Sequence, residues 1–524
     1  MSEENLDVAI IGGGVSGVYS AWRLLTDGKQ QRVTVFEDAD HIGGRLLSVV
    51  PPKIPHMTAE LGGMRILPAV QPRITKLIDV LNGDAAPEEK IETYPFPVDQ
   101  PNNISYLRGV HLRLSDFTAN PAKVPYNLTF QERGNTAGQL ALNAIEQVVP
   151  GITDPNLSEA QRRKMAQAAH FGNRPLFQQG FWGVLMRVMS SEAYQLALAA
   201  GGYESTLTNW NAADAIPWYL SDFGVKPEYR GFRKGFQQVP LTLADRVKKA
   251  HGGIWCNTKI KGFELKDGGV EIRLEDERII HANNLILAMP RRALELLEPE
   301  SPFLQDPSVQ KLVRSVTPRP LFKLFTTYAD PWWLPAGVSK GRTTTDMPVR
   351  QTYYWPKDDG EAAQGGRAML MASYDDGTNI GFWDGFRNKR GIGWRADVSG
   401  VGHREYYKGA DDEDADSEWR KYRAPRRMVA EVQRQLLEVH GLKFLPDVRS
   451  ASYKDWGDDP FGGGWNSWNI GVKSWEVKTE ILRPVPEAPV FICGEAYSDA
   501  QGWVEGALET ADAMLKKHFG ICSL

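Results

Sequence analysis

Three glycines near the N-terminus have the spacing of a phosphate-binding turn. Gly12, Gly14 and Gly17 follow the apolar run LDVAII and open a segment of helical periodicity. Glycines allow a tight turn and a close approach of the backbone to a pyrophosphate, whose charge a helix N-terminus stabilises. Glu37 lies 20 residues beyond Gly17, at the end of the next apolar run, where a carboxylate bonds a ribose diol. Strand, glycines, helix, strand and acid in this order predict a dinucleotide site.

A pair of adjacent glycines further along the chain lies between two charged residues. Residues 59–65 read AELGGMR, with Gly62 and Gly63 between Glu60 and Arg65. A glycine pair indicates a sharp bend or a close approach of the backbone to another group. Arginine forks onto carboxylates and phosphates through two parallel hydrogen bonds. Three interpretations stay open: a surface loop end whose arginine forms an ordinary ion pair, for example with Glu60, a clamp for cofactor phosphates, or a binding group for an anionic substrate.

Lys323 lies inside the otherwise apolar run RPLFKLFTTY. A lysine is costly to bury unless its ammonium meets water or a polar partner. The sequence therefore leaves two interpretations, a functional buried amine or a lysine at a strand end whose stem is buried and whose charge reaches solvent.

Segments of different periodicity must position these residues. Residues 127–230 read mostly helical, whereas 254–288 indicate a meander of strands and 320–375 indicate further strands. The acidic run at 410–419 is interpreted as a solvated loop before a helix. Pro425 is compatible with that helix only near its start or as a break.

Composition and charge exclude several classes of protein. At 524 residues the chain exceeds the size of a single hydrophobic core, so two or three subdomains are expected. A net charge of −4 gives no basic footprint for nucleic acid. Three widely spaced cysteines form neither a disulfide framework nor a metal pattern, which favours a reducing, cytoplasmic location and no metal. The sequence holds no run of 18 apolar residues, so a soluble protein without a membrane span is expected.

Motifs at both ends of the chain indicate which dinucleotide is bound. EDADHIGGR places Gly43, Gly44 and Arg45 just after the ribose acid, and VFICGEAYSDAQGWVEGALETA closes the chain at residues 490–511. Both segments resemble signatures of the flavin amine oxidase superfamily. The resemblance implies FAD, with Arg45 at its phosphates and Glu495 at its ribityl–phosphate region. It also implies that a helix beginning near Val504 points its positive end at the flavin, where it stabilises the anionic reduced ring.

The resemblance also implies the fold and the full set of cofactor contacts. It implies a mixed α/β (α+β) chain with a Rossmann-type FAD-binding domain, a β-sheet substrate-binding domain and a helical domain. The expected FAD-binding parts are 1–70, 231–315 and 451–524, the substrate-binding parts are 71–126 and 316–450, and the helical domain is 127–230. The residues assigned to the cofactor are Gly12, Gly14, Val15, Ser16, Gly17, Glu37, Gly43, Gly44, Arg45, Gly62, Gly63, Met64, Arg65, Ile260, Glu495, Gly502, Trp503 and Val504.

The mode of flavin attachment is predicted from a missing side chain. Monoamine oxidases carry a cysteine roughly thirty residues before the Gly-Glu of the last signature. The corresponding stretch here, GGGWNSWNIG at 462–471, contains none. Non-covalent FAD is therefore expected.

The middle of the chain resembles the L-amino acid oxidase branch of this superfamily. AELGGMR is similar to the branch's segment in which the arginine pairs with the substrate carboxylate, here Arg65. In the stretch GRTTTDMPVRQTYYWP the resemblance assigns the second tyrosine, Tyr354, to the same carboxylate, and strand alternation allows only one of Tyr353 and Tyr354 to face it. Core packing is the alternative for either tyrosine.

The same branch implies the catalytic and side-chain-binding residues. Lys323 is expected to hold a water beside the flavin, and Trp503 to form one wall of an aromatic cage next to Gly502. Trp465 is the preferred candidate for the facing wall, with Trp468 as an alternative, although both are also compatible with core packing. Four residues of the helical stretch are candidates for the side-chain pocket: Glu204, Asp214, Trp218 and Asp222.

The predicted function is FAD-dependent oxidative deamination of L-amino acids by dioxygen to 2-oxo acids, ammonium and hydrogen peroxide. An amino-acid 2-monooxygenase, which decarboxylates to an amide, and an amine oxidase without carboxylate recognition are the alternatives. A non-enzymatic escort protein of the same fold is disfavoured by the intact glycine and acid motifs. A homo-oligomer, most simply a dimer, is expected, without nucleic-acid or membrane partners.

Overall fold

The predicted strand at the N-terminus lies in the middle of a seven-stranded sheet. The computed structural model describes residues 5–28, 30–223, 228–386, 411, 417–457 and 462–524. β1 (Asn5–Ile11) runs parallel to β2 (Val33–Phe36) and to β14 (Ile279–Leu287). The order is β11-β2-β1-β14-β13-β12, with β22 (Val490–Ile492) also paired to β14. The remaining strands are β11 (Gly253–Trp255), β12 (Ile260–Lys266) and β13 (Gly269–Leu274).

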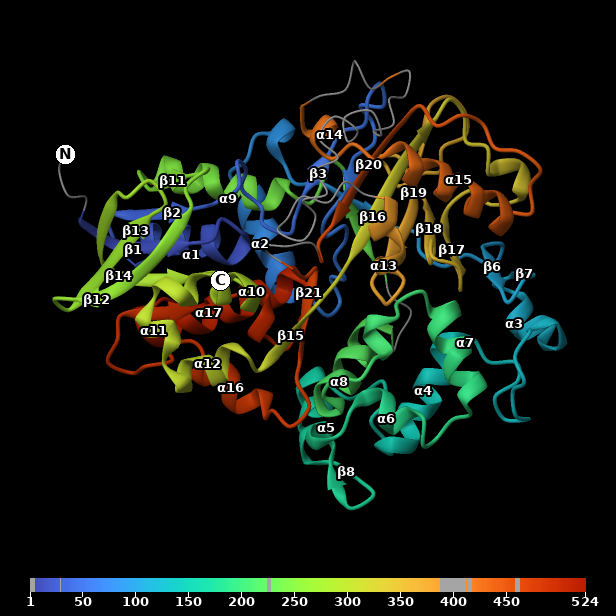
Figure 1. Cartoon of the computed structure of the whole chain (residues 1–524), viewed down its shortest axis with the longest axis horizontal. Coiled ribbons are helices and arrows are strands. Elements are labelled where there is room, and N and C mark those ends of the chain that lie inside the picture. Colours follow the sequence, from blue (N-terminus) through green and yellow to red (C-terminus); the bar gives the residue numbers. More distant parts are fainter. Residues whose placement is uncertain (1–4, 29, 224–227, 387–410, 412–416, 458–461) are drawn as a thin grey trace.

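Helices distant in sequence pack together on one face of this sheet. α1 (Val15–Thr26) follows the glycine turn and packs against α17 (Val504–Phe519), which closes the chain, and against α9 (Gln238–Lys249). Figure 1 shows α1 in blue and α17 in red within the same part of the molecule. The first and last signatures of the sequence therefore meet in one core.

The second sheet also has seven strands, in the order β20-β16-β19-β18-β17-β6-β7. Its pairs are antiparallel except for the parallel pair of β17 with β6. Every residue of β16 and β19 is buried, as expected for the apolar runs in the sequence. The strands are β6 (Ile104–Leu107), β7 (Val110–Arg113), β16 (Phe322–Tyr328), β17 (Gly341–Thr345), β18 (Gln351–Tyr354), β19 (Ala368–Asp375) and β20 (Ser450–Asp455).

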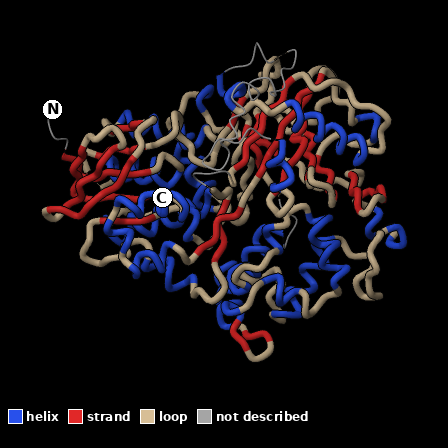
Figure 2. The backbone as a smooth tube through the Cα atoms, viewed as in Figure 1, coloured by secondary structure: helices blue, strands red, loops and turns tan. Residues whose placement is uncertain are grey.

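A layer of helices forms a third part of the molecule, at the lower right of Figures 1 and 2. Two of these helices begin at capping boxes, Thr136 with Gln139 and Ser158 with Gln161. The prediction that residues 127–230 are mostly helical is thus confirmed for the described part of this range. The exceptions are the short hairpin β8 (His170–Phe171) and β9 (Arg174–Pro175) and the first residue of β10 (Arg230–Phe232). The helices are α4 (Ala137–Val148), α5 (Glu159–Ala168), α6 (Phe181–Leu185), α7 (Ser191–Gly201) and α8 (Ala212–Phe223).

Two expected domain boundaries differ from the observed packing. α2 (Pro72–Asn82) buries its apolar side in the core of the first sheet, although it was assigned to the substrate-binding part. β20 pairs with β16 in the second sheet, although most of it was assigned to the FAD-binding part. Both differences arise because a boundary placed from sequence cannot show which core an amphipathic helix or edge strand joins.

Pro425 lies at a break between two helices, which is one of the two interpretations that the sequence allows. α14 (Ser417–Lys421) ends before it, and Pro425 is the N-cap of α15 (Arg426–Val439). Most of the acidic run at 410–419 lies outside the described residues. No helix among the described residues is long and apolar enough to cross a membrane.

Short elements connect the three parts. The strands are β3 (Ser48–Val49), β4 (Ala59–Glu60), β5 (Thr93–Pro95), β10 (Arg230–Phe232), β15 (Val316–Arg319) and β21 (Trp465–Trp468). The helices are α3 (Asp116–Ala119), α10 (Arg291–Leu297), α11 (Pro302–Gln305), α12 (Pro307–Val313), α13 (Ile380–Trp383) and α16 (Ser474–Glu480).

Candidate active site

The three glycines after β1 do not all serve the same structural purpose. A Cβ atom at Gly12 would lie 2.5 Å from the Ala288 carbonyl oxygen, and one at Gly17 would lie 1.9 Å from the Gly12 carbonyl oxygen. These two positions exclude any side chain because strand and helix pack closely there. A Cβ at Gly14 would meet nothing nearer than Gly44 Cα at 4.0 Å. The middle glycine therefore leaves open space on the side where a pyrophosphate is expected.

Glu37 is fixed beside this turn by backbone donors. Its Oε2 accepts a hydrogen bond from the Gly13 amide at 2.7 Å, and its Oε1 accepts one from the Ala39 amide at 2.8 Å. Burial raises the pKa of the Glu37 carboxyl, whereas these two amide bonds lower it. A carboxylate held at the end of β2 in this way is in the place that a ribose diol requires.

The glycine pair of AELGGMR is explained by a neighbouring segment. A Cβ at Gly62 would lie 2.1 Å from the Arg45 carbonyl oxygen, and one at Gly63 would lie 2.6 Å from Leu46 Cδ2. The Gly63 amide also donates to the Arg45 carbonyl oxygen at 2.9 Å. The segments that carry Arg45 and Arg65 thus run side by side without room for side chains between them.

All three parts of the chain line one large cavity of about 740 Å³. Of the residues assigned to the cofactor and of the first-choice catalytic and substrate-binding residues, only Gly17 and Tyr354 are not among its lining residues. Gly17 serves the helix–strand packing described above, so its absence agrees with its role. The predicted residues that line the cavity are Gly12, Gly14, Val15, Ser16, Glu37, Gly43, Gly44, Arg45, Gly62, Gly63, Met64, Arg65, Ile260, Lys323, Trp465, Glu495, Gly502, Trp503 and Val504.

Two helix N-termini reach this cavity without side-chain caps. Gly14 is the N-cap of α1 and Trp503 is the N-cap of α17, and neither side chain caps its helix. The first amides of a helix lack partners within the helix and attract negative charge. Two sets of helix N-terminal amides in the lining of one cavity fit a ligand with a pyrophosphate and an electron-rich ring.

Arg45 and Glu495, both predicted to contact the cofactor, contact each other. Arg45 Nη1 lies 2.7 Å from Glu495 Oε2. Glu495 also accepts hydrogen bonds from the Gly502 amide at 2.7 Å and the Asn466 amide at 3.0 Å. Glu495 therefore joins three parts of the cavity wall: the segment Gly43-Gly44-Arg45, β21 and the loop before α17.

Arg65 is buried, with 5% of its surface exposed, and lines the same cavity. Its Nη2 donates to the Tyr203 hydroxyl at 2.9 Å and its Nη1 donates to the Tyr353 hydroxyl at 3.3 Å. Its guanidinium stacks on the Tyr229 ring, 3.9 Å from the centroid. No Asp or Glu among the described residues forms an ion pair with Arg65, so the possible pair with Glu60 is not formed.

The assignment of Tyr354 to the carboxylate is wrong. The Tyr354 hydroxyl bonds Thr343 Oγ1 at 2.6 Å and His440 Nε2 at 2.8 Å, in the core of the second sheet. Tyr353 points to the opposite face of β18 and reaches Arg65. Alternation correctly predicts that Tyr353 and Tyr354 lie on opposite faces of the strand, but it cannot tell which face meets Arg65.

Three tyrosines that the sequence did not single out also line the cavity, namely Tyr422 and the neighbouring pair Tyr203 and Tyr374. Tyr203 follows α7 in the helical part, and Tyr374 lies in β19. Their rings meet edge to face with centroids 5.5 Å apart. Neither lies in a motif shared with the quoted signatures, and the only local signal at Tyr203 is the preceding glycine pair of GGYES.

Lys323 is fully enclosed, with 1% of its surface exposed, so the interpretation as a strand-end lysine reaching solvent is wrong. Its Nζ donates to the carbonyl oxygens of Glu60, at 3.1 Å, and Gly62, and lies 4.9 Å from the Tyr374 ring centroid. Burial lowers the pKa of the Lys323 ammonium, while the Glu60 charge opposes that shift. Burial raises the pKa of Glu60 in turn.

Aromatic rings form the wall opposite the glycine segments. Trp465 stacks on Trp218 of α8, with centroids 5.6 Å apart and planes 16° apart. The backbone of Gly502 passes over Trp465, since a Cβ there would lie 3.5 Å from Trp465 Cβ. Trp468 is instead a core residue whose Nε1 donates to the Ser498 carbonyl oxygen at 3.1 Å. The structure therefore places Trp465 and Trp503, and not Trp468, at the cavity.

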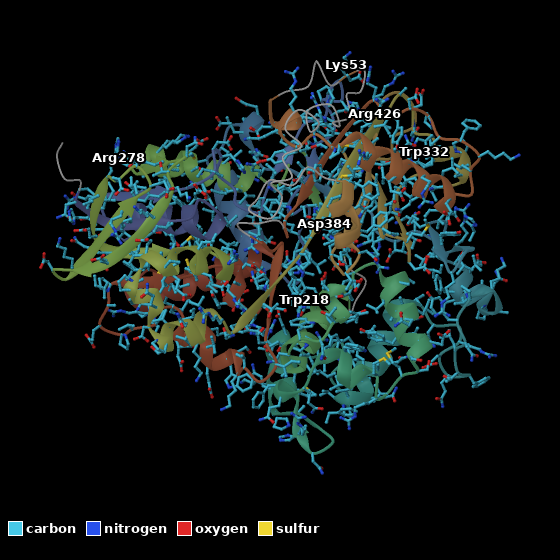
Figure 3. The ribbon with its side chains drawn as sticks, viewed as in Figure 1. Lys53, Trp218, Arg278, Trp332, Asp384 and Arg426 are labelled. Carbon is cyan, nitrogen blue, oxygen red and sulfur yellow. The ribbon has the colours of Figure 1, made fainter. Side chains whose placement is uncertain are left out.

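Two of the four side-chain-pocket candidates from the helical part line the cavity, and two do not. Trp218 and Asp222 line the cavity. Glu204 bonds Thr378 Oγ1 at 2.9 Å, and Asp214 bonds Ser474 Oγ at 2.6 Å, away from it. Figure 3 labels Trp218 on the side of the helical part that faces the rest of the molecule.

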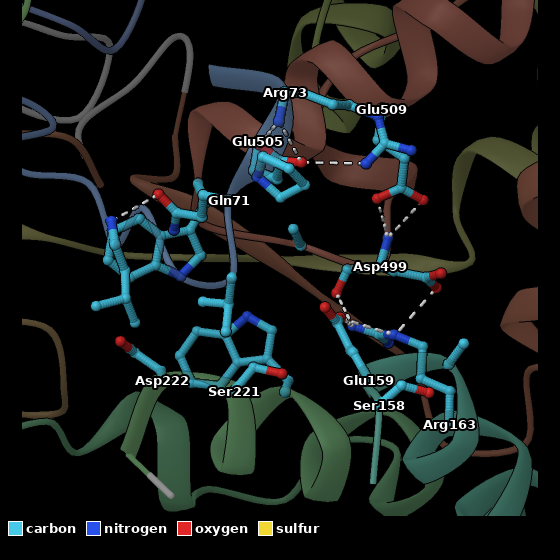
Figure 4. A pocket seen from close by; sticks show the side chains of 17 residues that line it. Gln71, Arg73, Ser158, Glu159, Arg163, Ser221, Asp222, Asp499, Glu505 and Glu509 are labelled. Carbon is cyan, nitrogen blue, oxygen red and sulfur yellow. Dashed lines mark hydrogen bonds and ion pairs between the residues drawn. The ribbon is translucent and has the colours of Figure 1, made fainter. Parts of the chain in front are cut away.

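A smaller cavity of about 410 Å³ adjoins the large one and shares Trp218, Asp222 and Trp503 with it. Figure 4 shows its polar side chains held in ion pairs and hydrogen bonds with one another. Arg73 lies 3.1 Å from Glu505, and Arg163 lies 2.6 Å from Glu159. These groups neutralise one another in pairs and form the rim of the active-site region.

A glycine cradle for a dinucleotide, continued by a chamber with a buried arginine, a buried lysine and tryptophan walls, defines a flavin-dependent oxidoreductase. The sequence profile of the flavin-containing amine oxidoreductases matches residues 15–390 of the chain. Since this match covers more than half of the sequence, the protein belongs to that family and uses a flavin cofactor.

Several proteins are similar to the chain over nearly its whole length. Aplysianin-A of Aplysia kurodai is 27% identical over 99% of this chain and 92% of its own, and achacin of Lissachatina fulica is 26% identical over 98% and 93%. An L-amino-acid oxidase of Siganus canaliculatus is 22% identical over 96% and 83%. Wild-type putrescine oxidase bound to putrescine shares the fold, with a TM-score of 0.64 at 17% identity over 97% of both chains.

Proposed function

We propose that this protein is an FAD-dependent L-amino acid oxidase. It converts an L-amino acid, dioxygen and water to a 2-oxo acid, ammonium and hydrogen peroxide. Similarity to proteins named L-amino-acid oxidase supports this choice within the family.

Arg65 is the observation that carries the proposal. Its charge is buried in the cavity wall beside the flavin-binding glycines, and no carboxylate of the described residues forms an ion pair with it. Two tyrosine hydroxyls and the charge of Asp222, which is not in ion-pair contact, offset part of the cost of burying Arg65, and an anionic ligand in direct contact offsets more of it. A simple amine has no anionic group to offer, whereas an α-amino acid has a carboxylate that matches the guanidinium fork.

The lining of the cavity supports FAD as the flavin. The lining includes the expected ribose-binding acid Glu37 beside the glycine turn as well as Trp465 and Trp503, and the volume is about 740 Å³. Non-covalent binding is supported by the cysteines. None of the three, all of which the structure describes, is among the lining residues.

Bound there, FAD supplies the acceptor for the hydride of amine oxidation, and dioxygen then takes up the two electrons as peroxide. Arg65 binds the substrate carboxylate and so fixes the position of its α-carbon. Trp465 and Trp503 confine the substrate between aromatic walls. Lys323 Nζ donates two of its three hydrogens to carbonyl oxygens, which leaves one for a water molecule beside the flavin that would assist the reaction of the reduced flavin with dioxygen.

A substrate panel tests this function. The purified protein should be yellow, and at least one of the twenty L-amino acids should give peroxide and ammonium. A colourless protein that cannot take up FAD would refute the flavin assignment. Peroxide from simple amines but from no amino acid would instead identify an amine oxidase.

A further inference from the structure

We propose that Tyr203, from the helical part, donates a hydrogen bond to the substrate carboxylate and forms a two-residue clamp with Arg65. This inference rests on the proposed function, because it concerns how an amino acid is held. It assigns to Tyr203 the role that the family resemblance implies for Tyr354.

The contacts of Tyr203 place its hydroxyl at the right position. It lies 2.9 Å from Arg65 Nη2 and 3.1 Å from the Tyr353 hydroxyl. Tyr203 and Arg65 line the large cavity, whereas Tyr353 and Tyr354 do not. A carboxylate that approaches Arg65 through the cavity therefore meets the hydroxyl of Tyr203 before that of Tyr353.

The positions of the hydroxyl hydrogens decide which tyrosine can donate. Arg65 carries only donors, so the oxygens of Tyr203 and Tyr353 both accept from it. The Tyr353 hydroxyl donates its hydrogen to Gln351 Oε1 at 3.3 Å. In the free protein the Tyr203 hydrogen therefore points to the Tyr353 oxygen, 3.1 Å away, and it can turn to a bound carboxylate, which is the stronger acceptor. Tyr203 is thus the donor available to a carboxylate.

The backbone and the surrounding rings hold Tyr203 in this position. Gly202 has a φ of +86°, and its carbonyl oxygen accepts from Gln351 Nε2 at 3.0 Å. A Cβ at Gly202 would lie 2.7 Å from Gln351 Cδ, so glycine is required where the helical part meets the sheet. Tyr374 packs edge to face against the Tyr203 ring, and the Arg342 guanidinium lies 5.5 Å from its centroid.

The clamp therefore spans two parts of the chain. Arg65 comes from the loop after β4 and Tyr203 from the loop after α7. Both side chains are buried, with 5% of the surface of Arg65 and 9% of that of Tyr203 exposed. A hydrogen bond to a charged group in such a place contributes more than one in water.

The experiment compares Tyr203→Phe with the matched control Tyr354→Phe. Each variant loses one buried hydroxyl, but only the first loses a group of the cavity. Stopped-flow reduction of the bound flavin, with the L-amino acid that the wild type oxidises fastest, gives the dissociation constant and the limiting rate separately. The decarboxylated amine of the same amino acid is the second ligand.

In Tyr203→Phe we expect the dissociation constant of the amino acid to rise about 10- to 100-fold, the range for a hydrogen bond to a charged group. The limiting rate and the binding of the amine should change less than about threefold, because neither depends on this bond. Tyr354→Phe should bind the amino acid as the wild type does. Tyr203→His, which keeps a donor, should bind more tightly than Tyr203→Phe, and serves alone if the latter does not fold.

Unchanged amino-acid binding in Tyr203→Phe, or an equal loss in Tyr354→Phe, would overturn the clamp while leaving the oxidase function intact. An equal loss of amino-acid and amine binding would also overturn it, because it would show a general defect of the cavity. A wild-type protein that oxidises only amines would refute the proposed function, and the role of Tyr203 with it.

Discussion

Replacing Arg65 by methionine removes the charge on which the substrate class depends while keeping much of the side-chain volume. In the free protein the cost should be small. The change deletes a buried cation without an ion-pair partner, and the hydroxyls of Tyr203 and Tyr353, 3.1 Å apart, bond each other. We therefore expect the melting temperature of Arg65→Met to equal or exceed that of the wild type.

The cost appears when an amino acid binds. Two parallel charge-assisted bonds are lost, each worth about 1.5–3 kcal/mol, so transition-state binding should weaken by about 3–5 kcal/mol. At about 1.4 kcal/mol per factor of ten, kcat/KM for the best L-amino acid should fall about 10²- to 10⁴-fold. Peroxide formation at several substrate concentrations gives this ratio.

The matching amine without a carboxylate is the internal control. Its kcat/KM should stay within about threefold of the wild type or rise, because Arg65 no longer offers an unpaired charge beside it. An amino-acid kcat/KM within about fivefold of the wild type would refute the role of Arg65. A parallel fall for amine and amino acid would show that Arg65 supports the cavity rather than the carboxylate.

Three further changes test other parts of the structure. Gly17→Ala should abolish stable folding or FAD uptake, since its Cβ would lie 1.9 Å from the Gly12 carbonyl oxygen; an alanine variant with wild-type flavin content and melting temperature would contradict this packing. Lys323→Met should slow the reaction of the reduced protein with dioxygen about 10- to 100-fold while sparing flavin reduction, and equal effects on both half-reactions in stopped-flow would count against the assigned role. His440 is fully buried, and burial lowers the pKa of its imidazole to about 4, so the unfolded chain binds a proton that the folded chain refuses. Its contribution to stability should therefore fall by up to about 3 kcal/mol as pH drops from about 6.5 to 4; urea unfolding should show this loss reduced in His440→Gln.

Local chemistry made the cofactor site predictable. The glycine turn, Glu37 and the two end signatures depend on short segments whose backbone needs are visible in the sequence, and their residues line one cavity. Gly17 shows the limit of residue-by-residue transfer, because it serves packing rather than contact.

Long-range register made the carboxylate site harder to predict. Arg65 and Tyr203 are 138 residues apart, and Arg65 and Tyr353 are 288 apart. Which face of β18 meets Arg65 depends on how the second sheet packs against the loop after β4, and no local pattern encodes that. Tyr203 was missed for the same reason, since a tyrosine after a helix carries no signal until the helical part is placed over the cavity.

The products of wild-type turnover test the central claim most directly. Purified, FAD-loaded protein should consume one L-amino acid and one dioxygen for each 2-oxo acid, ammonium and hydrogen peroxide formed. Carbon dioxide and an amide as the main products would instead identify an amino-acid 2-monooxygenase. Peroxide with simple amines only would contradict carboxylate recognition at Arg65.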